Sequence, residues 1–122
     1  MKKLTGKEDQ IMQVIWKLKH VFIRDIVVQL PNPKPHYNTV ATLVKILVKK
    51  GFLKSEKLGN TDQYSPKISL EAYRQEDIKE IKKKYFGNSM PKMMAHFAKQ
   101  EQLSDKEIEE LIQIIKSKNK RP

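Results

Sequence analysis

Residues 37–51 read YNTVATLVKILVKKG, and this stretch decides the fold. Its apolar residues recur at intervals of three and four positions, which predicts an amphipathic helix from Tyr37 to Lys50. Gly51 is well placed to cap the C-terminus of that helix, where a left-handed backbone favours glycine. The apolar stripe consists of Val40, Leu43, Val44 and Leu47.

Two more helical patterns precede this helix. Thr5 and Glu8 have the spacing of a capping box and open a helix from about Gly6 to Lys19. The segment from Phe22 to Leu30 reads as a short helix or as a strand entering one, and a proline-rich turn follows it.

A hairpin pattern follows the helix. The segments from Phe52 to Lys57 and around Tyr64 flank Gly59-Asn60, a dipeptide typical of tight hairpin turns. Three helices and a hairpin predict a winged helix-turn-helix over residues 1–66.

Residues 67–122 are expected to be helical, with Ser69 capping one helix, Pro91 in the first turn of another, and Ser104 with Glu107 opening a third. Short helices cannot bury such apolar stripes within one monomer, so we expect a helical segment that forms a homodimer. The fold class is therefore mainly α with a small β-hairpin wing. The expected dimer interface comprises Leu70, Tyr73, Ile81, Met90, Met93, Met94, Phe97, Ile108, Leu111, Ile112 and Ile115.

The composition of the chain limits the classes of function that it can have. The 122 residues carry 25 Lys and Arg against 14 Asp and Glu, a formal net charge of +11, which favours a polyanionic partner. The excess of positive charge is greater in the N-terminal half, where 12 basic and 5 acidic residues precede Lys67. The absence of Cys, of a signal peptide pattern and of a long apolar run predicts a cytoplasmic protein without membrane insertion.

No sequence pattern indicates catalysis or a cofactor. The three histidines are scattered and lack neighbouring carboxylate motifs, so no metal site is expected, and there is no phosphate-binding glycine loop or nucleophile motif. We expect a protein that is not an enzyme.

The polar side of the helix at 37–50 is the candidate DNA-reading surface. Asn38 and Thr42 would reach base edges while Lys45 and Lys49 meet phosphates, with Thr39 and Ala41 at the margins. A merely solvated helix face is the alternative for an isolated helix. The hairpin adds Lys54, Lys57, Asn60 and Thr61 as possible DNA contacts, although lysines on an edge strand also serve to prevent aggregation.

Over nearly the whole chain the sequence resembles the penicillinase repressor family of winged-helix transcriptional repressors. The resemblance rests on four segments: residues 8–16, residues 38–52, Tyr64-Ser65-Pro66 and residues 103–111. It implies a homodimer on a dyad-symmetric operator that is released by a signal. In antibiotic-responsive members a membrane-bound sensor triggers cleavage, commonly at an Asn-Phe bond, and the matching position here is His96-Phe97. The copper-responsive branch uses a Cys-rich metal site, which a chain without Cys excludes.

Two other functions fit parts of the pattern. A winged helix can serve as a protein-interaction module whose basic face is incidental. The net positive charge would also suit an RNA-binding protein. Single-stranded RNA usually stacks on several aromatic side chains, however, and only Tyr37 and Tyr64 are candidates for such a platform.

Overall fold

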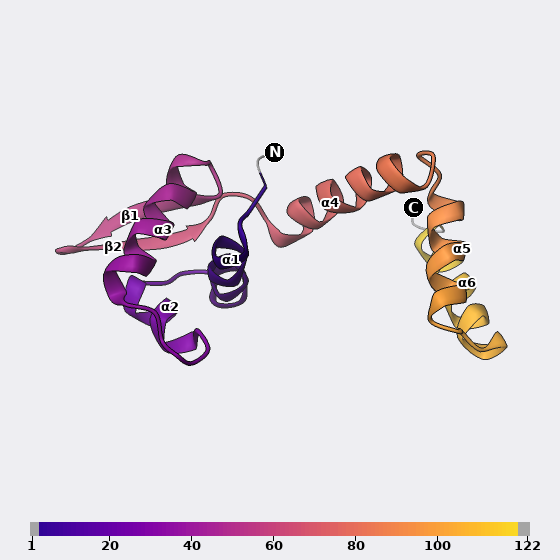
Figure 1. Ribbon diagram of the computed structural model, residues 1–122, viewed down its shortest axis with the longest axis horizontal. Coiled ribbons are helices and arrows are strands. Elements are labelled where there is room, and N and C mark those ends of the chain that lie inside the picture. Colours follow the sequence, from indigo (N-terminus) through magenta and orange to yellow (C-terminus); the bar gives the residue numbers. More distant parts are fainter. Residues whose placement is uncertain (1–2, 120–122) are drawn as a thin grey trace. The chain divides into compact units, whose positions relative to one another are not determined.

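The computed structural model describes residues 3–119, with side chains described up to residue 117 (Figure 1). It contains α1 (Gly6–Leu18), α2 (Ile23–Gln29), α3 (Tyr37–Lys49), β1 (Leu53–Leu58), β2 (Thr61–Pro66), α4 (Leu70–Tyr85), α5 (Met90–Gln100) and α6 (Asp105–Asn119). This confirms the predicted class, mainly α with a β-hairpin. The chain divides into two compact units, the first ending at Glu76 and the second beginning at Asp77. The division falls inside α4, ten residues beyond the expected domain end at residue 66.

The first unit is built on one apolar core that α1, α2, α3 and the base of the hairpin share. Helix α3 contributes Val40, Val44 and Leu47, each at most 1% exposed. Burial of an aliphatic side chain of this kind stabilises the fold by about 1.5–3 kcal/mol. The stripe that predicted α3 from the sequence therefore anchors it in the core.

The ends of α1 and α3 follow the predicted capping chemistry. Glu8 N–H donates to Thr5 Oγ1 while Thr5 N–H donates to Glu8 Oε1, which completes the capping box. At the end of α3, Gly51 adopts φ +89° and its N–H donates to the Val48 carbonyl. Because Phe52 N–H also donates to the Leu47 carbonyl, this end is a Schellman motif.

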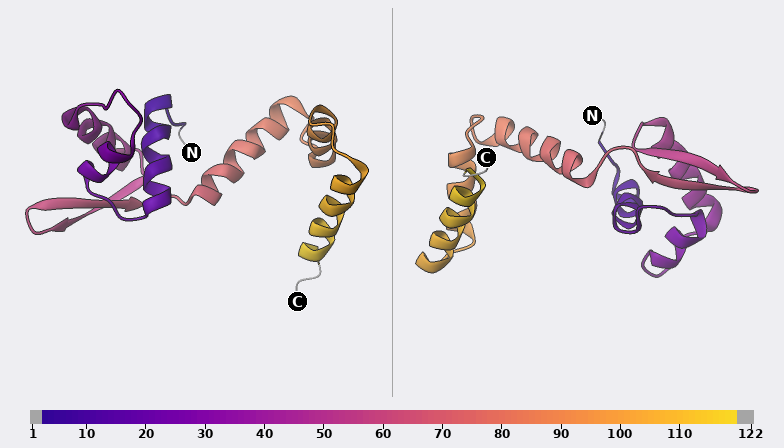
Figure 2. Two further views of the ribbon diagram at one scale, coloured as in Figure 1. Left: turned by 90° about the horizontal axis from the view of Figure 1, so that it is seen from below. Right: turned by 180° about the vertical axis from the view of Figure 1, so that it is seen from behind.

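The hairpin pairs β1 with β2 in antiparallel register, from Leu53 opposite Pro66 to Leu58 opposite Thr61. Gly59 and Asn60 form the two-residue turn, and Gly59 takes φ +64°, as the first central position of a type II′ turn requires. Figure 2 shows the hairpin reaching beyond the three helices. Val21 bridges to Tyr64 just before α2, and the segment from Phe22 to Leu30, for which a helix and a strand entering a helix were both open, contains the helix α2.

The second unit contains the end of α4, all of α5 and all of α6. Rings from Phe86, His96 and Phe97 cluster with centroids 5.3–5.8 Å apart. The predicted capping box between Ser104 and Glu107 is present. Helix α6 runs from Asp105 to Asn119. Within residues 3–119 no helix is long and apolar enough to cross a membrane.

Candidate nucleic-acid interface

Helix α3 separates its two faces as the sequence predicts. Asn38, Thr42, Lys45 and Lys49 are all exposed on the side opposite the buried stripe. Thr39 is exposed beside them, but Ala41 is half-buried and packs against the core. The available polar surface of α3 is therefore centred on Asn38, Thr42, Lys45 and Lys49.

Local hydrogen bonds set how the start of α3 presents its polar groups. His36 is the N-cap, and its Nδ1 accepts from the Asn38 N–H at 3.1 Å. Thr42 Oγ1 donates to the Asn38 carbonyl at 2.9 Å, which is the usual back-bond of a threonine within a helix. The hydroxyl hydrogen of Thr42 is thereby occupied, while its methyl group and the oxygen lone pairs remain for a partner.

The four predicted hairpin residues do not form one surface. Strand side chains alternate between faces, so Lys54 and Lys57, three positions apart on β1, lie on opposite faces of the hairpin. Lys57, Asn60 and Thr61 are exposed at or next to the turn, and Lys57 is opposite Asp62. Lys54 lies at the base, roughly 15 Å from the tip at about 3.3 Å per residue.

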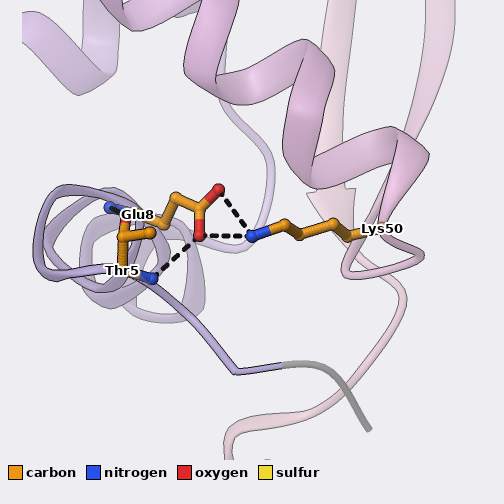
Figure 3. Close-up of polar contacts among 3 residues, drawn as sticks. All are labelled: Thr5, Glu8 and Lys50. Atoms are coloured by element: carbon orange, nitrogen blue, oxygen red, sulfur yellow. Dashed lines mark hydrogen bonds and ion pairs between the residues drawn. The ribbon is translucent and has the colours of Figure 1, made fainter.

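An ion pair fixes the far end of α3 to α1 (Figure 3). Lys50, the C-cap of α3, donates from Nζ to Glu8 Oε1 at 2.8 Å and to Oε2 at 3.0 Å. Glu8 is 2% exposed. Burial raises the pKa of Glu8, but the hydrogen bonds from Lys50 and Thr5 and the charge of Lys50 outweigh it, so the pKa lies below its usual value. The carboxyl group of Glu8 is therefore ionised at neutral pH.

The expected dimer residues fall into two groups. Leu70 and Tyr73 pack on the core of the first unit, where the Tyr73 ring lies 5.5 Å from Trp16 and 5.7 Å from Phe52. This intramolecular packing differs from the expected role in a dimer interface. Of the others, Met93 is buried, Ile81, Met94 and Leu111 are half-buried, and Met90, Phe97, Ile108, Ile112 and Ile115 are exposed.

Several residues that the sequence reasoning passed over belong to these surfaces. Ile46 is exposed on α3 next to Thr42, while Ile78 and Tyr85 are exposed on the part of α4 in the second unit. Helical spacing from Thr42 and from Ile81 could have identified them. The Glu8–Lys50 pair joins residues 42 positions apart, and no local pattern predicts it.

The sequence of the chain matches the family model described as "Penicillinase repressor" over residues 4–117. A penicillinase repressor of Staphylococcus aureus is 34% identical over 98% of this chain and 95% of its own length. The chain belongs to the penicillinase repressor family. The penicillinase repressor of Bacillus licheniformis is 29% identical, again over 98% of this chain and 94% of its own length. The methicillin resistance regulatory protein MecI of Staphylococcus aureus is 26% identical over 95% of each chain.

Solved structures connect the penicillinase repressor family to the first unit. The DNA-binding domain of the repressor BlaI aligns with a TM-score of 0.51 and 30% identity, covering 60% of this chain and 94% of that one. Monomeric Bacillus licheniformis BlaI in complex with the blaP half-operator aligns with a TM-score of 0.50 and 27% identity, covering 59% and 89%. The predicted winged helix is therefore confirmed.

Proposed function

We propose that this protein is a DNA-binding transcriptional repressor that occupies a dyad-symmetric operator as a homodimer. The observation that carries the proposal is the division of α3 into a buried apolar stripe and an exposed face of amide, hydroxyl and ammonium groups. The likeness to BlaI in complex with a half-operator supports DNA as the partner. An operator-bound repressor acts where the chromosome lies, in the cytoplasm.

In this proposal α3 enters the major groove with its N-terminal end leading. Asn38 and Thr42 then face base edges, and Lys45 and Lys49 lie along the phosphates. Arg and Lys contacts to phosphate supply sequence-independent affinity, whereas amide and methyl contacts to bases supply sequence preference. Thr39 and Ile46 adjoin this face and add small apolar contacts.

The hairpin tip is the second DNA contact. Lys57, Asn60 and Thr61 lie together at or beside the turn and are exposed. A projecting turn with one ammonium group suits contact with the sugar-phosphate backbone next to the major groove. Lys54, at the base of the hairpin and on its other face, is left out of this contact.

The homodimer is supported by the apolar surface of the second unit. Among residues 77–117 only Met93 is a buried large apolar side chain, while Ile78, Tyr85, Met90, Phe97, Ile108, Ile112 and Ile115 are exposed. Monomeric proteins rarely expose large contiguous apolar patches, and these residues lack a core of their own. A second copy of the same helices would cover them and bring a second α3 to the other half of a symmetric operator.

Release of the operator by proteolysis is a further part of the proposal. The His96-Phe97 bond lies within α5, and the Phe97 ring packs 5.8 Å from that of Phe86. Cleavage there would divide the dimer helices and remove the gain in affinity that two linked half-sites provide. Fragments ending at His96 should appear in cells when the regulated genes are induced. An intact chain during induction would exclude this route and the sensor protease as a partner.

The central test is in vitro selection of random duplex DNA with the full chain, followed by native mass spectrometry of the selected complex at two salt concentrations. We expect a dyad-symmetric sequence bound by two chains, with an affinity that falls steeply as salt is raised. A selection without enrichment, from a protein that is nevertheless a folded dimer, would favour the protein-interaction alternative.

A further inference from the structure

A cavity of about 480 Å³ lies in the first unit, and no residue of α3 or of the Gly59-Asn60 turn lines it. The end of α1, the base of the hairpin and the segment leading into α4 line it. Its volume is in the range of small-molecule sites, about 300–1,000 Å³. Its lining includes Lys54 and Leu70, two residues that the sequence placed in the DNA contact and the dimer interface and that the proposed function leaves out of both.

The lining combines apolar and basic residues. Trp16 and Leu70 are its large apolar members, and Lys19, Lys54 and Lys67 are its lysines. His20 lies beside them, and none of the described lining residues is acidic. Within residues 3–119 none of these three lysines forms an ion pair with a carboxylate.

The backbone at Lys19 is held in an unusual conformation. Lys19 has φ +75° and ψ −47°, and around it His20 N–H donates to the Leu18 carbonyl at 2.9 Å. This is a γ-turn with a positive φ at its central residue, which is rare and strained for a residue with a Cβ. A glycine would adopt it without that cost, yet the position holds a lysine that lines the cavity.

We infer that this cavity is a binding site for a small organic anion, a carboxylate or phosphate attached to an apolar body. Three like charges around one cavity repel one another, and a bound anion would remove that repulsion while the apolar body covers Trp16 and Leu70. This inference goes beyond the proposed function, because neither DNA reading nor the second unit requires an occupied cavity.

The position of the cavity gives such a ligand a route to regulation. Ser69, the cap of α4, and Leu70, its first residue, both line it. Trp16 Nε1–H donates to the Ile68 carbonyl at 2.9 Å, so the same wall holds the segment that enters α4. An occupant that contacts both sides would stabilise the first turn of α4, which leads toward the proposed dimer helices.

Trp16 is the only tryptophan in the chain, so its fluorescence reports on this cavity alone. The experiment titrates the full chain at low salt with benzoate and with phenyl phosphate, using benzamide as the uncharged probe. We expect a saturable change with the two anions and none with benzamide, and an apparent affinity that weakens as salt is raised. No saturable change with either anion, or an equal response to benzamide, would overturn the inference.

The paired variants test the charges directly. Lys19→Gln with Lys67→Gln should weaken anion binding about a hundredfold or more, because two charge-assisted hydrogen bonds to the anion are lost. Lys7→Gln with Lys79→Gln removes the same net charge from exposed positions elsewhere and should leave anion binding unchanged. Equal weakening by both pairs would mean that only net charge matters. A salt slope of DNA binding that falls in the first pair but not in the second would assign Lys19 and Lys67 to phosphates of DNA, again overturning the inference.

Discussion

The ammonium group of Lys50 lies 2.8 Å from the Oε1 of Glu8, and this contact joins the C-cap of α3 to the first turn of α1. The same Oε1 accepts the Thr5 N–H at 2.9 Å, so one carboxylate both caps α1 and holds the end of α3. Lys50 is 24% exposed at its side chain and Glu8 only 3%, so removing one partner leaves a poorly solvated charge or a lost cap.

Glu8→Gln should lower the free energy of unfolding by about 1–3 kcal/mol at neutral pH, because the amide cannot reproduce a charge-assisted hydrogen bond to Lys50. The pKa of Glu8 is lowered in the folded state, so its contribution is present above the unfolded pKa and is lost as pH falls through the folded pKa. Chemical denaturation across the acid range should therefore show the wild type and the variant converging as the pH falls.

Asp9→Asn is the matched control, since it removes a carboxylate from the same turn of α1 without an ion pair to Lys50. Its effect should stay within about 0.5 kcal/mol. If the difference in free energy of unfolding between the wild type and Glu8→Gln did not change with pH, the charge of the ion pair would contribute nothing beyond packing.

Thr42 tests whether α3 reads bases through a methyl group. Its hydroxyl hydrogen is occupied by the Asn38 carbonyl, so Thr42→Val should keep the affinity for the selected operator within about threefold. Thr42→Ser, which keeps the hydroxyl and loses the methyl, should weaken it about fourfold, the value of one buried methyl group. Binding isotherms on the selected site give both numbers. The reverse order would mean that the hydroxyl, and not the methyl, contacts the base.

Lys45 and Lys49 should act through phosphates. Replacing either by Gln should weaken binding to all duplexes alike and reduce the slope of log affinity against log salt by about one. Electrophoretic mobility shifts with specific and random duplexes over a salt series measure both quantities. Lys79→Gln, on α4 in the second unit, should leave the slope unchanged. A loss confined to the selected sequence would identify the altered lysine as a base-reading residue.

The dimer surface on α6 can be tested with two isoleucines that differ in position. Ile112 belongs to the apolar stripe and is 42% exposed in the single chain, whereas Ile114 is 66% exposed and lies away from that stripe on the helix. Ile112→Asp should yield a monomer with a folded first unit, because a carboxylate buried in an apolar interface is costly. Ile114→Asp should remain a dimer. Sedimentation velocity distinguishes the two, and a dimeric Ile112→Asp would move the interface off this stripe.

The fold of the first unit could be predicted from local patterns because each of its signals acts within a few residues. The stripe Val40 to Leu47, the capping box of Thr5 and Glu8, and the Gly59-Asn60 turn each specify one element without long-range help. The start of α2 was left open between helix and strand, since the Val21 bridge depends on Tyr64, 43 positions later.

The candidate site was predictable only in part, because some of its residues are placed by contacts between distant segments. A helical wheel correctly places Asn38, Thr42, Lys45 and Lys49 on one exposed face, because the geometry of a helix relates neighbours in sequence to neighbours in space. It does not reveal that Ala41 packs on the core, nor that Lys54 lies with Lys19 and Lys67 and apart from the hairpin tip. Apolar spacing alone likewise grouped Leu70 and Tyr73 with the dimer helices, although both pack on the first unit.

The sequence by itself determined the secondary structure outside the start of α2, the winged-helix class, the basic character and the family. Periodicity, capping, turn chemistry and charge are properties of short segments or of composition. The tertiary structure alone decided which distant residues meet: Glu8 with Lys50, Trp16 with Tyr73, and three lysines around one cavity. Such contacts depend on how helices and strands pack around a shared core. That packing depends on the burial of many side chains from distant parts of the sequence, so no local pattern predicts it.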